Sequence, residues 1–215
     1  MTSLSRRNVL ACGLALAGRA AWAATPAPDR LVFEVTRNGR AIGTHTLTFI
    51  RASEDLRVLI DASFRVGFGP ITLYRYEHRG EERWQNGRFA SLRTDTNDNG
   101  KIFQLRAQRG PQGVAIRATD LADQTAPDAA LPLTHWAQQA MQAPLFNPQT
   151  GKMLNETARP IGRGTIVLAD GKPIAANGYT LEGEAPIKDW YDSAGAWAAL
   201  DAVGKDGSAI AYRRG

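Results

Sequence analysis

The stretch that decides the fold is Leu56-Arg57-Val58-Leu59-Ile60-Asp61-Ala62-Ser63-Phe64-Arg65-Val66-Gly67-Phe68. Its seven even-numbered residues are apolar, and most of the residues between them are charged, small or polar. Successive side chains of a β-strand point to opposite faces, so this period of two predicts one long strand with one face in a core. A helix would need apolar residues with a period near 3.6, which this stretch does not have.

Turn signals separate further extended segments on both sides of this strand. Asn-Gly or Asp-Gly pairs stand at 38–39, 86–87, 99–100, 170–171 and 206–207. Such pairs supply the positive φ angles that tight hairpin turns need, so successive strands should be mostly antiparallel neighbours. We expect strands near residues 31–37, 41–51, 56–68, 71–84, 88–96, 101–109, 113–117, 153–161, 165–168, 174–182, 187–191, 196–203 and 208–213. The predicted fold class is all-β, with a large antiparallel curved sheet or a flattened half-barrel or sandwich.

One stretch departs from the β pattern. Apolar Leu133, Trp136, Ala140 and Met141 recur at helical spacing. Thr134 is the expected N-cap, and a proline at position 144 ends the run, so we predict one short helix near residues 134–143. A short helix with one apolar face must lie on the sheet or across an open end of it. It would close the core or gate a ligand cavity.

The N-terminus has the pattern of a twin-arginine signal peptide. Arg6 and Arg7 precede an apolar run over residues 11–17, and Ala21-Trp22-Ala23 offers a small-residue cleavage site. The apolar run is too short to span a bilayer. A short buried helix of the fold is the alternative, but two prolines just after the segment separate it from the rest of the chain. We predict cleavage after residue 23, leaving a single β domain over residues 24–215, soluble in the periplasm.

Composition narrows the chemistry of the exported chain. The only cysteine, Cys12, lies in the predicted signal, so the mature chain would hold no disulfide and no thiol. Cleavage removes three of the 26 basic residues and none of the 21 acidic ones, which lowers the net charge from +5 to +2. A nearly neutral chain gives no support for nucleic-acid binding. The densest basic cluster is interleaved with acids, which predicts an ion-pair ladder on a solvated hairpin. It comprises Arg75, Arg79, Arg83 and Arg88 with Glu77, Glu81 and Glu82.

A combination of short motifs extends over nearly all of the mature chain. They are Asn38-Gly39 with Ile42-Gly43 and His45, Tyr74-Arg75-Tyr76-Glu77-His78-Arg79, Trp84, Asp98-Asn99-Gly100-Lys101, Thr134-His135-Trp136, Thr150-Gly151 and Trp190-Tyr191-Asp192. In these motifs the chain resembles an exported bacterial family of uncharacterised proteins, domain-of-unknown-function family 6134. The resemblance implies a periplasmic, predominantly β protein with no assigned activity. It carries no functional residue over to this chain.

Histidines are the first candidates for chemistry, and the chain has three: His45, His78 and His135. Three imidazoles bind zinc when a fold brings them together, but no two of these are close enough in sequence to form a metal motif. His45 alternates with core residues, which predicts a histidine at the edge of the core with its hydrogen bonds satisfied. His78 shares a strand face with Tyr74 and Tyr76. We predict no metal and no cofactor.

Signatures of catalysis are also sparse. The sequence has no Gly-x-Ser-x-Gly elbow and no phosphate-binding glycine loop. Paired carboxylates occur as Asp95 with Asp98 and as Asp189 with Asp192. Asp98 immediately precedes a predicted turn, where hydrogen bonds to the turn backbone are its expected role. We therefore assign no catalytic residue.

Aromatic side chains with polar tips are the remaining candidates for a site. Such rings bind glycans, lipid head groups or protein partners, and they serve equally in a core where their polar atoms are satisfied. The candidate ligand-binding residues are Tyr74, Tyr76, His78, Trp84, His135, Trp136, Trp190 and Tyr191.

These observations suggest three functions. The leading one is a non-catalytic binding or cell-envelope assembly module, because a long apolar sheet face under a lone helix suits a hydrophobic or amphipathic ligand. The second is a hydrolase or lyase acting on cell-wall or exopolysaccharide glycans, which requires His78, His135, Tyr76 and Asp98 to converge in one cleft. The third is a scaffold whose sheet edge binds an envelope protein. The partners would be a lipid, a glycan or an envelope protein, besides the twin-arginine export machinery.

Overall fold

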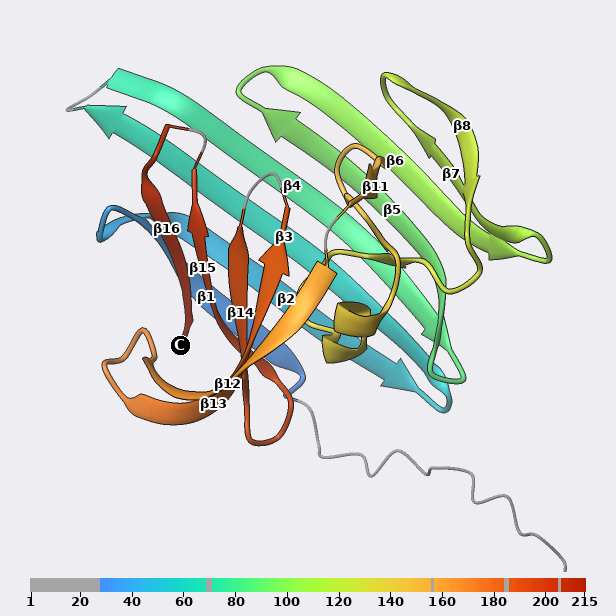
Figure 1. The fold of residues 1–215 in the computed structure, drawn as a ribbon. Coiled ribbons are helices and arrows are strands. Elements are labelled where there is room, and N and C mark those ends of the chain that lie inside the picture. Colours follow the sequence, from blue (N-terminus) through green and yellow to red (C-terminus); the bar gives the residue numbers. More distant parts are fainter. Residues whose placement is uncertain (1–27, 69–70, 156, 184–185, 205) are drawn as a thin grey trace, which may run out of the picture.

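The computed structural model describes residues 28–68, 71–155, 157–183, 186–204 and 206–215. The signal peptide predicted over residues 1–23, including Arg6 and Arg7, lies outside these residues. Regular structure in the described part is almost entirely β, as the sequence predicts (Figure 1). No helix within it is long and apolar enough to cross a membrane.

Thirteen strands form one antiparallel sheet in the order β12-β13-β14-β15-β16-β1-β2-β3-β4-β5-β6-β7-β8. Two meanders, β1 to β8 and β12 to β16, are joined where β1 pairs with β16. The sheet curls without closing, and β8 and β12 are its edges (Figure 1). The predicted fold class is confirmed. The strands of the sheet are β1 (Arg30–Arg37), β2 (Arg40–Ala52), β3 (Asp55–Phe68), β4 (Ile71–Gln85), β5 (Arg88–Asp98), β6 (Lys101–Gly110), β7 (Gly113–Ala118), β8 (Leu121–Ala126), β12 (Thr157–Val167), β13 (Pro173–Glu182), β14 (Ile187–Asp192), β15 (Trp197–Val203) and β16 (Ala209–Arg214).

The hairpin turns have the expected chemistry. Asn38, Asn86 and Asn99 each have a φ of 51°, and the glycines after them have φ values of 75°, 72° and 96°. Two successive positive φ angles are the mark of a type I′ turn, whose twist matches that of the flanking strands. These turns set the hairpins β1–β2, β4–β5 and β5–β6.

The concave face of the sheet holds the main core. Along β3, Val58, Ile60 and Ala62 are buried, whereas Leu59 and Asp61 between them are exposed. The predicted alternation of this strand is therefore confirmed. Buried side chains of the neighbouring strands continue the same layer on both sides.

The residues between β8 and β12, which we call the central segment (127–155), lie within the curl of the sheet (Figure 1). The segment contains a small sheet in which β10 (Leu145–Phe146) pairs with β9 (Leu131–Pro132) and with β11 (Met153–Leu154). Its apolar side chains belong to the same core as residues from both meanders. The central segment therefore fills the curl that would otherwise be open.

The helix predicted over residues 134–143 is shorter and of a different type. A 3-10 helix, η1 (Gln138–Gln142), begins after Ala137 without a side-chain cap. The predicted N-cap, Thr134, instead donates a hydrogen bond from its hydroxyl to Glu82 on β4. The apolar residues anchor an irregular segment here, because tertiary contacts to the sheet replace the backbone bonds of a longer helix.

Two strand predictions differ from the structure. The segments expected at 153–161 and 165–168 are β11 and one continuous strand, β12, with a bulge between Pro160 and Gly162. Proline lacks the N–H that an interior strand would use, and β12 is an edge strand, where this is tolerated. β8 was not expected, because Leu121–Ala126 lacks an alternating apolar pattern.

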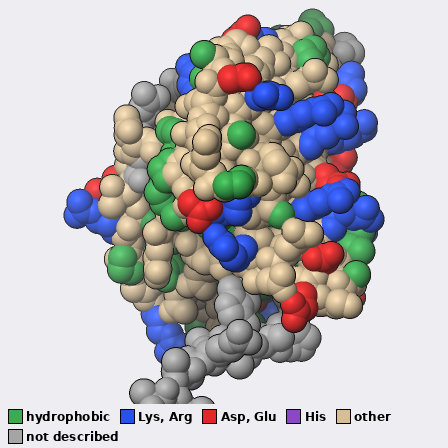
Figure 2. All heavy atoms as spheres, turned by 90° about the vertical axis from the view of Figure 1, so that its right-hand side faces the viewer, with side chains coloured by type: hydrophobic (Ala, Val, Ile, Leu, Met, Phe, Trp, Pro, Cys, Tyr) green, Lys and Arg blue, Asp and Glu red, His purple; other side chains and the backbone are tan. Residues whose placement is uncertain are grey.

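All four arginines of the basic cluster on β4 and β5 form ion pairs, two with acids of the cluster and two with acids outside it. Arg75 pairs with Glu77, Arg79 with Asp61 (3.4 Å), Arg83 with Glu81 (2.6 Å) and Arg88 with Asp128 (3.0 Å). Glu82 takes no part in these ion pairs, because its side chain points into the core. Basic and acidic side chains are interspersed in the same way over the face shown in Figure 2. Exposed pairs of this kind contribute about 0–1 kcal/mol each.

Candidate ligand-binding cavity

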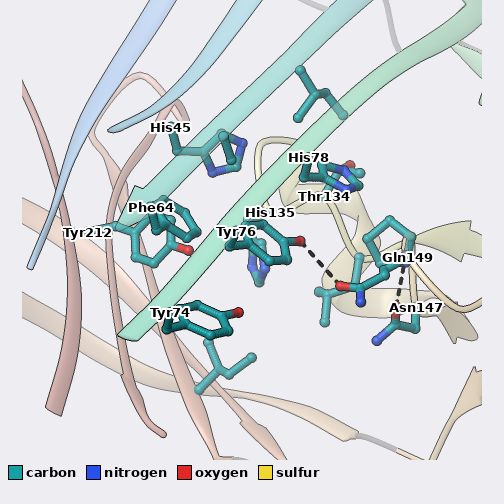
Figure 3. Close-up of a pocket in the computed structure, with 15 residues that line it drawn as sticks. His45, Phe64, Tyr74, Tyr76, His78, Thr134, His135, Asn147, Gln149 and Tyr212 are labelled. Carbon is teal, nitrogen blue, oxygen red and sulfur yellow. Dashed lines mark hydrogen bonds between the residues drawn. The ribbon is translucent and has the colours of Figure 1, made fainter. Parts of the chain in front are cut away.

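A cavity of about 330 Å³ lies between the concave face of the sheet and the central segment (Figure 3). Its volume is at the lower end of the range of small-molecule sites. The sheet contributes aromatic and imidazole side chains from β2, β3, β4 and β16, and the central segment contributes mainly polar ones. The lining residues are His45, Ile60, Ala62, Phe64, Tyr74, Tyr76, His78, Leu133, Thr134, His135, Asn147, Pro148, Gln149, Ile187 and Tyr212.

Strand β4 supplies three polar aromatic side chains to this wall. Tyr74, Tyr76 and His78 alternate along the strand and therefore share its concave face. The phenol of Tyr74 donates to Asp98 Oδ1 (2.8 Å). That of Tyr76 donates to Gln149 Oε1 (3.2 Å) (Figure 3). Burial raises the pKa of both phenols above the ordinary value, so both keep their protons at neutral pH.

His45 and His78 reach the cavity in one cross-strand row. His45 on β2 is opposite Ala62 on β3, and Ala62 is opposite His78 on β4. The two imidazoles are thus two strands apart, about 10 Å along the sheet, and the small alanine leaves space between them. Burial lowers the pKa of His45 to about 3 and that of His78 to about 4. Both rings are therefore neutral at pH 7.

The hydrogen bonding of these two rings differs. Nδ1 of His78 lies 2.7 Å from the hydroxyl of Thr96. In contrast, Nε2 of His45 is shielded from solvent and has no hydrogen-bond partner among the described residues. The prediction that His45 is satisfied within the fold is therefore wrong. Its ring packs against Trp197 and Tyr212 instead, because β15 and β16 bring aromatic side chains to this row.

His135 is held by four separate features. Its φ of +65° is uncommon for a residue with a side chain, and its carbonyl accepts a hydrogen bond from Tyr191 Oη (2.7 Å). Its Nδ1 lies 2.8 Å from Asp189 Oδ2, and its ring stacks on Trp197 with centroids 5.3 Å apart. Asp189 is fully buried and also accepts from Trp197 Nε1 (3.0 Å). Such over-determined geometry fixes the direction of the imidazole in the cavity.

A second buried carboxylate, Glu82, ties the central segment to β4. It accepts hydrogen bonds from Trp84 Nε1 (2.7 Å), Trp136 Nε1 (3.0 Å) and Thr134 Oγ1 (3.0 Å). Burial raises its pKa to about 7, against the opposing effect of these three hydrogen bonds. The hydroxyl of Thr134 is thereby used as a donor within the protein.

The loop at residues 147–149 forms the opposite wall. Asn147 Oδ1 accepts from the backbone N–H groups of Gln149 (2.8 Å) and Thr150 (3.0 Å), which shapes the loop. Thr94 on β5 donates to the carbonyl of Pro148 (2.7 Å) and fixes the loop against the sheet. The cavity therefore has a sheet wall and a loop wall joined by direct hydrogen bonds.

The eight residues proposed from sequence fall into three groups. Tyr74, Tyr76, His78 and His135 line the cavity. Trp84, Trp136 and Tyr191 lie behind the wall, where each donates to Glu82 or to the carbonyl of His135. Trp190 lies on the opposite face of its strand from Tyr191, packs over Gly164 and Gly178, and donates to Asp201.

Sequence reasoning missed several residues of the site. Phe64, Tyr212, Asn147 and Gln149 line the cavity, and Asp189 orients His135. Phe64 carried a signal, since it belongs to the apolar face of residues 56–68. Tyr212 and the loop amides carried none, because their approach depends on the pairing of distant strands.

Asp98 also has a different role from the one expected. The turn after it is stabilised by Asn97, whose Oδ1 accepts from the N–H of Gly100 (2.8 Å). Asp98 points to the concave side and accepts from Tyr74. Alternation along β5 explains why Asn97 and not Asp98 binds the turn, because residues 97 and 98 face opposite sides of the sheet.

All three histidines line one cavity, yet they do not form a metal centre there. No group of three or more His, Cys, Asp or Glu side chains in the described ranges is arranged to hold a metal ion.

Comparison with known proteins adds a family and a fold. A family model described as "Domain of unknown function (DUF6134)" matches residues 33–215. No curated protein matches the chain. Among solved structures, the chain is similar to a "Beta-barrel-like Protein of Domain of Unknown Function DUF1849 from Brucella abortus" with a TM-score of 0.61 and 8% identity. The match covers 88% of this chain and 96% of that chain, and at this identity it shows the fold alone.

Proposed function

The chain belongs to the DUF6134 family, as its motifs indicate, and we propose that it is a non-catalytic binding module that holds a small amphipathic molecule in the cavity. The cavity itself carries this proposal: about 330 Å³ between an aromatic sheet wall and a polar loop wall. Sites of this kind bind ligands by apolar contact and use a few polar groups for orientation. We place this activity in the periplasm, in line with the predicted twin-arginine signal.

The unpartnered nitrogen of His45 supports a binding role. A buried polar atom without a hydrogen bond costs about 1–3 kcal/mol, so folded proteins retain few of them. Nε2 of His45 is such an atom among the described residues, and His45 lines the cavity. A ligand reaches this shielded atom only after a shift of the surrounding wall, and a hydrogen bond formed there would remove that cost.

A hydrolase is the second candidate, and the pair of His135 with Asp189 favours it. A buried carboxylate that orients an imidazole is the arrangement of a general base. None of the described lining residues is Ser or Cys, however, and Thr134 donates its hydroxyl to Glu82. Water would have to be the nucleophile. Release of reducing ends from peptidoglycan or exopolysaccharide by the wild type, but not by His135→Gln, would favour this function.

Native mass spectrometry tests the binding proposal. The protein is purified from the periplasm of its own cells, and its mass is compared before and after denaturation. We expect an additional mass that leaves on denaturation. Ala62→Leu should reduce the occupied fraction by about tenfold, because the larger side chain extends into the space between His45 and His78. Ala115→Leu on the exposed face of β7 is the matched control and should retain the mass. An empty wild-type protein would contradict the proposal.

A further inference from the structure

Three hydroxyl donors of the cavity wall are used inside the protein. Tyr74 donates to Asp98, Tyr76 donates to Gln149, and Thr134 donates to Glu82. A phenol or a hydroxyl has one O–H and two lone pairs, so each of these groups has only lone pairs left for a ligand. Asp189 accepts a hydrogen bond from Nδ1–H of His135, and when the ring carries this one proton its Nε2 is an acceptor as well.

Two of these acceptors have a carboxylate directly behind them. Asp98 accepts from Tyr74 at 2.8 Å, and Asp189 lies at the same distance from Nδ1 of His135. Hydrogen bonds in a chain polarise one another, so the phenolic oxygen and Nε2 become stronger acceptors. Asp189 is fully buried, and solvent ions screen its field less than that of a surface carboxylate.

Aromatic rings form a further part of the wall. Phe64 and Tyr76 stack with centroids 5.3 Å apart and an interplanar angle of 7°. Tyr212 stands nearly perpendicular to Phe64 at 5.9 Å and 84°. The faces of Tyr76 are covered by Phe64 and His78, and ring faces of this wall that are not stacked attract cations through their quadrupole.

The cavity wall provides no net positive charge for an anion, because His135 is paired with the carboxylate of Asp189. Among its described lining residues there is no lysine and no arginine. Burial lowers the pKa of His45 and His78 to about 3 and about 4, so neither ring carries a positive charge at neutral pH. A phosphate, sulfate or carboxylate would lose its hydration here without gaining a charged partner.

We propose that the cavity binds a primary ammonium group, the protonated amine of a molecule with a short hydrocarbon part. This inference rests on the proposed binding function and names its ligand class. The three N–H donors of the ammonium match the lone pairs of Tyr74, Tyr76 and His135, and its charge is stabilised by the ring faces and by Asp98 and Asp189. The hydrocarbon part lies against the apolar lining residues, which are Ile60, Ala62, Leu133 and Ile187.

The test compares three probes with the same hydrocarbon chain and different head groups: hexylammonium, hexan-1-ol and hexanoate. The untagged protein, expressed as the full chain, is labelled with ¹⁵N-histidine and titrated at pH 7.5. The chain has three histidines, and all of them line the cavity, so each imidazole signal reports on the site. We expect hexylammonium to bind at least about tenfold more tightly than hexan-1-ol and to shift the signals of His135 and His45. Its affinity should exceed that of hexanoate by a larger factor.

Carboxylate variants test the electrostatic part of the inference. Asp98→Asn removes the charge behind Tyr74 and should weaken hexylammonium binding roughly fivefold while leaving hexan-1-ol unchanged. Asp95→Asn is the matched control, because Asp95 lies on the same strand but is exposed on the outer face, where it accepts from Gln104. It should change neither affinity. Tyr74→Phe provides a second variant that removes the acceptor itself and keeps the ring.

Two outcomes would overturn the inference, and they differ in what else they affect. Equal affinity for hexylammonium and hexan-1-ol, or tighter binding of hexanoate, would refute the ammonium ligand and leave the binding function in place. Failure of all three probes to shift any histidine signal, together with an empty protein in native mass spectrometry, would refute both proposals.

Discussion

His45→Leu is the substitution whose effect can be worked out most fully from the structure. Nε2 of His45 is buried without a hydrogen-bond partner among the described residues, at a cost of about 1–3 kcal/mol. Leucine is of similar size and has no polar atom, and the neighbouring rings of Phe33, Trp197 and Tyr212 are apolar surfaces. We expect the variant to be more stable than the wild type by about 1–3 kcal/mol at pH 7.5 in the absence of ligand.

The pH dependence gives a second, independent expectation. The pKa of His45 is lowered from 6.5 to about 3 in the folded state, so the unfolded chain binds more protons between these values. The wild type therefore loses stability as pH falls below 6.5, by about 1.4 kcal/mol per pH unit for this one group. At pH 5 the advantage of His45→Leu should be larger by about 2 kcal/mol than at pH 7.5.

Urea denaturation at pH 7.5 and pH 5 measures both effects. His78 and Glu82 also titrate in this range, but they are present in both proteins, so the difference between variant and wild type isolates His45. His78→Leu is the matched control, because it removes the ring that contacts Thr96 and leaves that buried hydroxyl without its partner. The control should show no gain at pH 7.5. If His45→Leu is less stable than the wild type and its advantage does not grow at pH 5, the reasoning is refuted.

Three further predictions concern other parts of the fold. The folded-state pKa of Glu82 is raised to about 7, so its protonated form stabilises the fold below pH 4.5, and this contribution is lost as pH rises towards 7. Glu82→Gln should abolish this pH-dependent component in melting curves recorded across the range. A stability difference between variant and wild type that stays the same at every pH would contradict the prediction. Gly151→Ala should destabilise by about 1–3 kcal/mol more than Gly87→Ala in urea titrations. Both glycines have positive φ, but only at Gly151 would a Cβ meet a packed side chain, at 2.9 Å from Ile116; equal losses would refute this. Trp190→Ala should cost about 3 kcal/mol of stability and leave the ligand mass in native mass spectrometry, since Trp190 lies on the opposite strand face from Tyr191; loss of the mass from folded protein would contradict that placement.

The sequence predicts the β meander well because its signals are local. Asn-Gly pairs at 38–39, 86–87 and 99–100 specify type I′ turns, and alternation specifies which side chains of a strand share a face. These two rules place Tyr74, Tyr76 and His78 together on the concave side of β4. They require no knowledge of any other strand.

The convergence of the three histidines could not be predicted in the same way. The row from His45 through Ala62 to His78 depends on two registers. One is set by a turn at Ser53, a residue with a φ of 54° and no Asn-Gly signal, and the other is shifted by a bulge between Val66 and Gly67. A shift of one residue moves a side chain to the other face, so such irregularities decide the site.

His135 reaches the cavity by a route that has no periodic signal. It lies in the central segment, whose position is set by contacts with the sheet rather than by its own secondary structure. Its partner Asp189 lies on β14, in the meander β12 to β16, 54 residues further along the chain. A buried carboxylate cannot be distinguished by sequence from an exposed one until its partners are known, and here those partners are His135 and Trp197.

The construction of the cavity explains how one fold provides both stability and a binding site. The sheet wall is rigid because its strands pair along their whole length, while the loop wall is attached through a few directed contacts, including those of Tyr76 with Gln149 and of Glu82 with Thr134. A molecule that fills the cavity contacts both walls, since the lining residues come from both. Binding should therefore stabilise the attachment of the central segment to the sheet, because a ligand that binds only the folded protein shifts the folding equilibrium towards it.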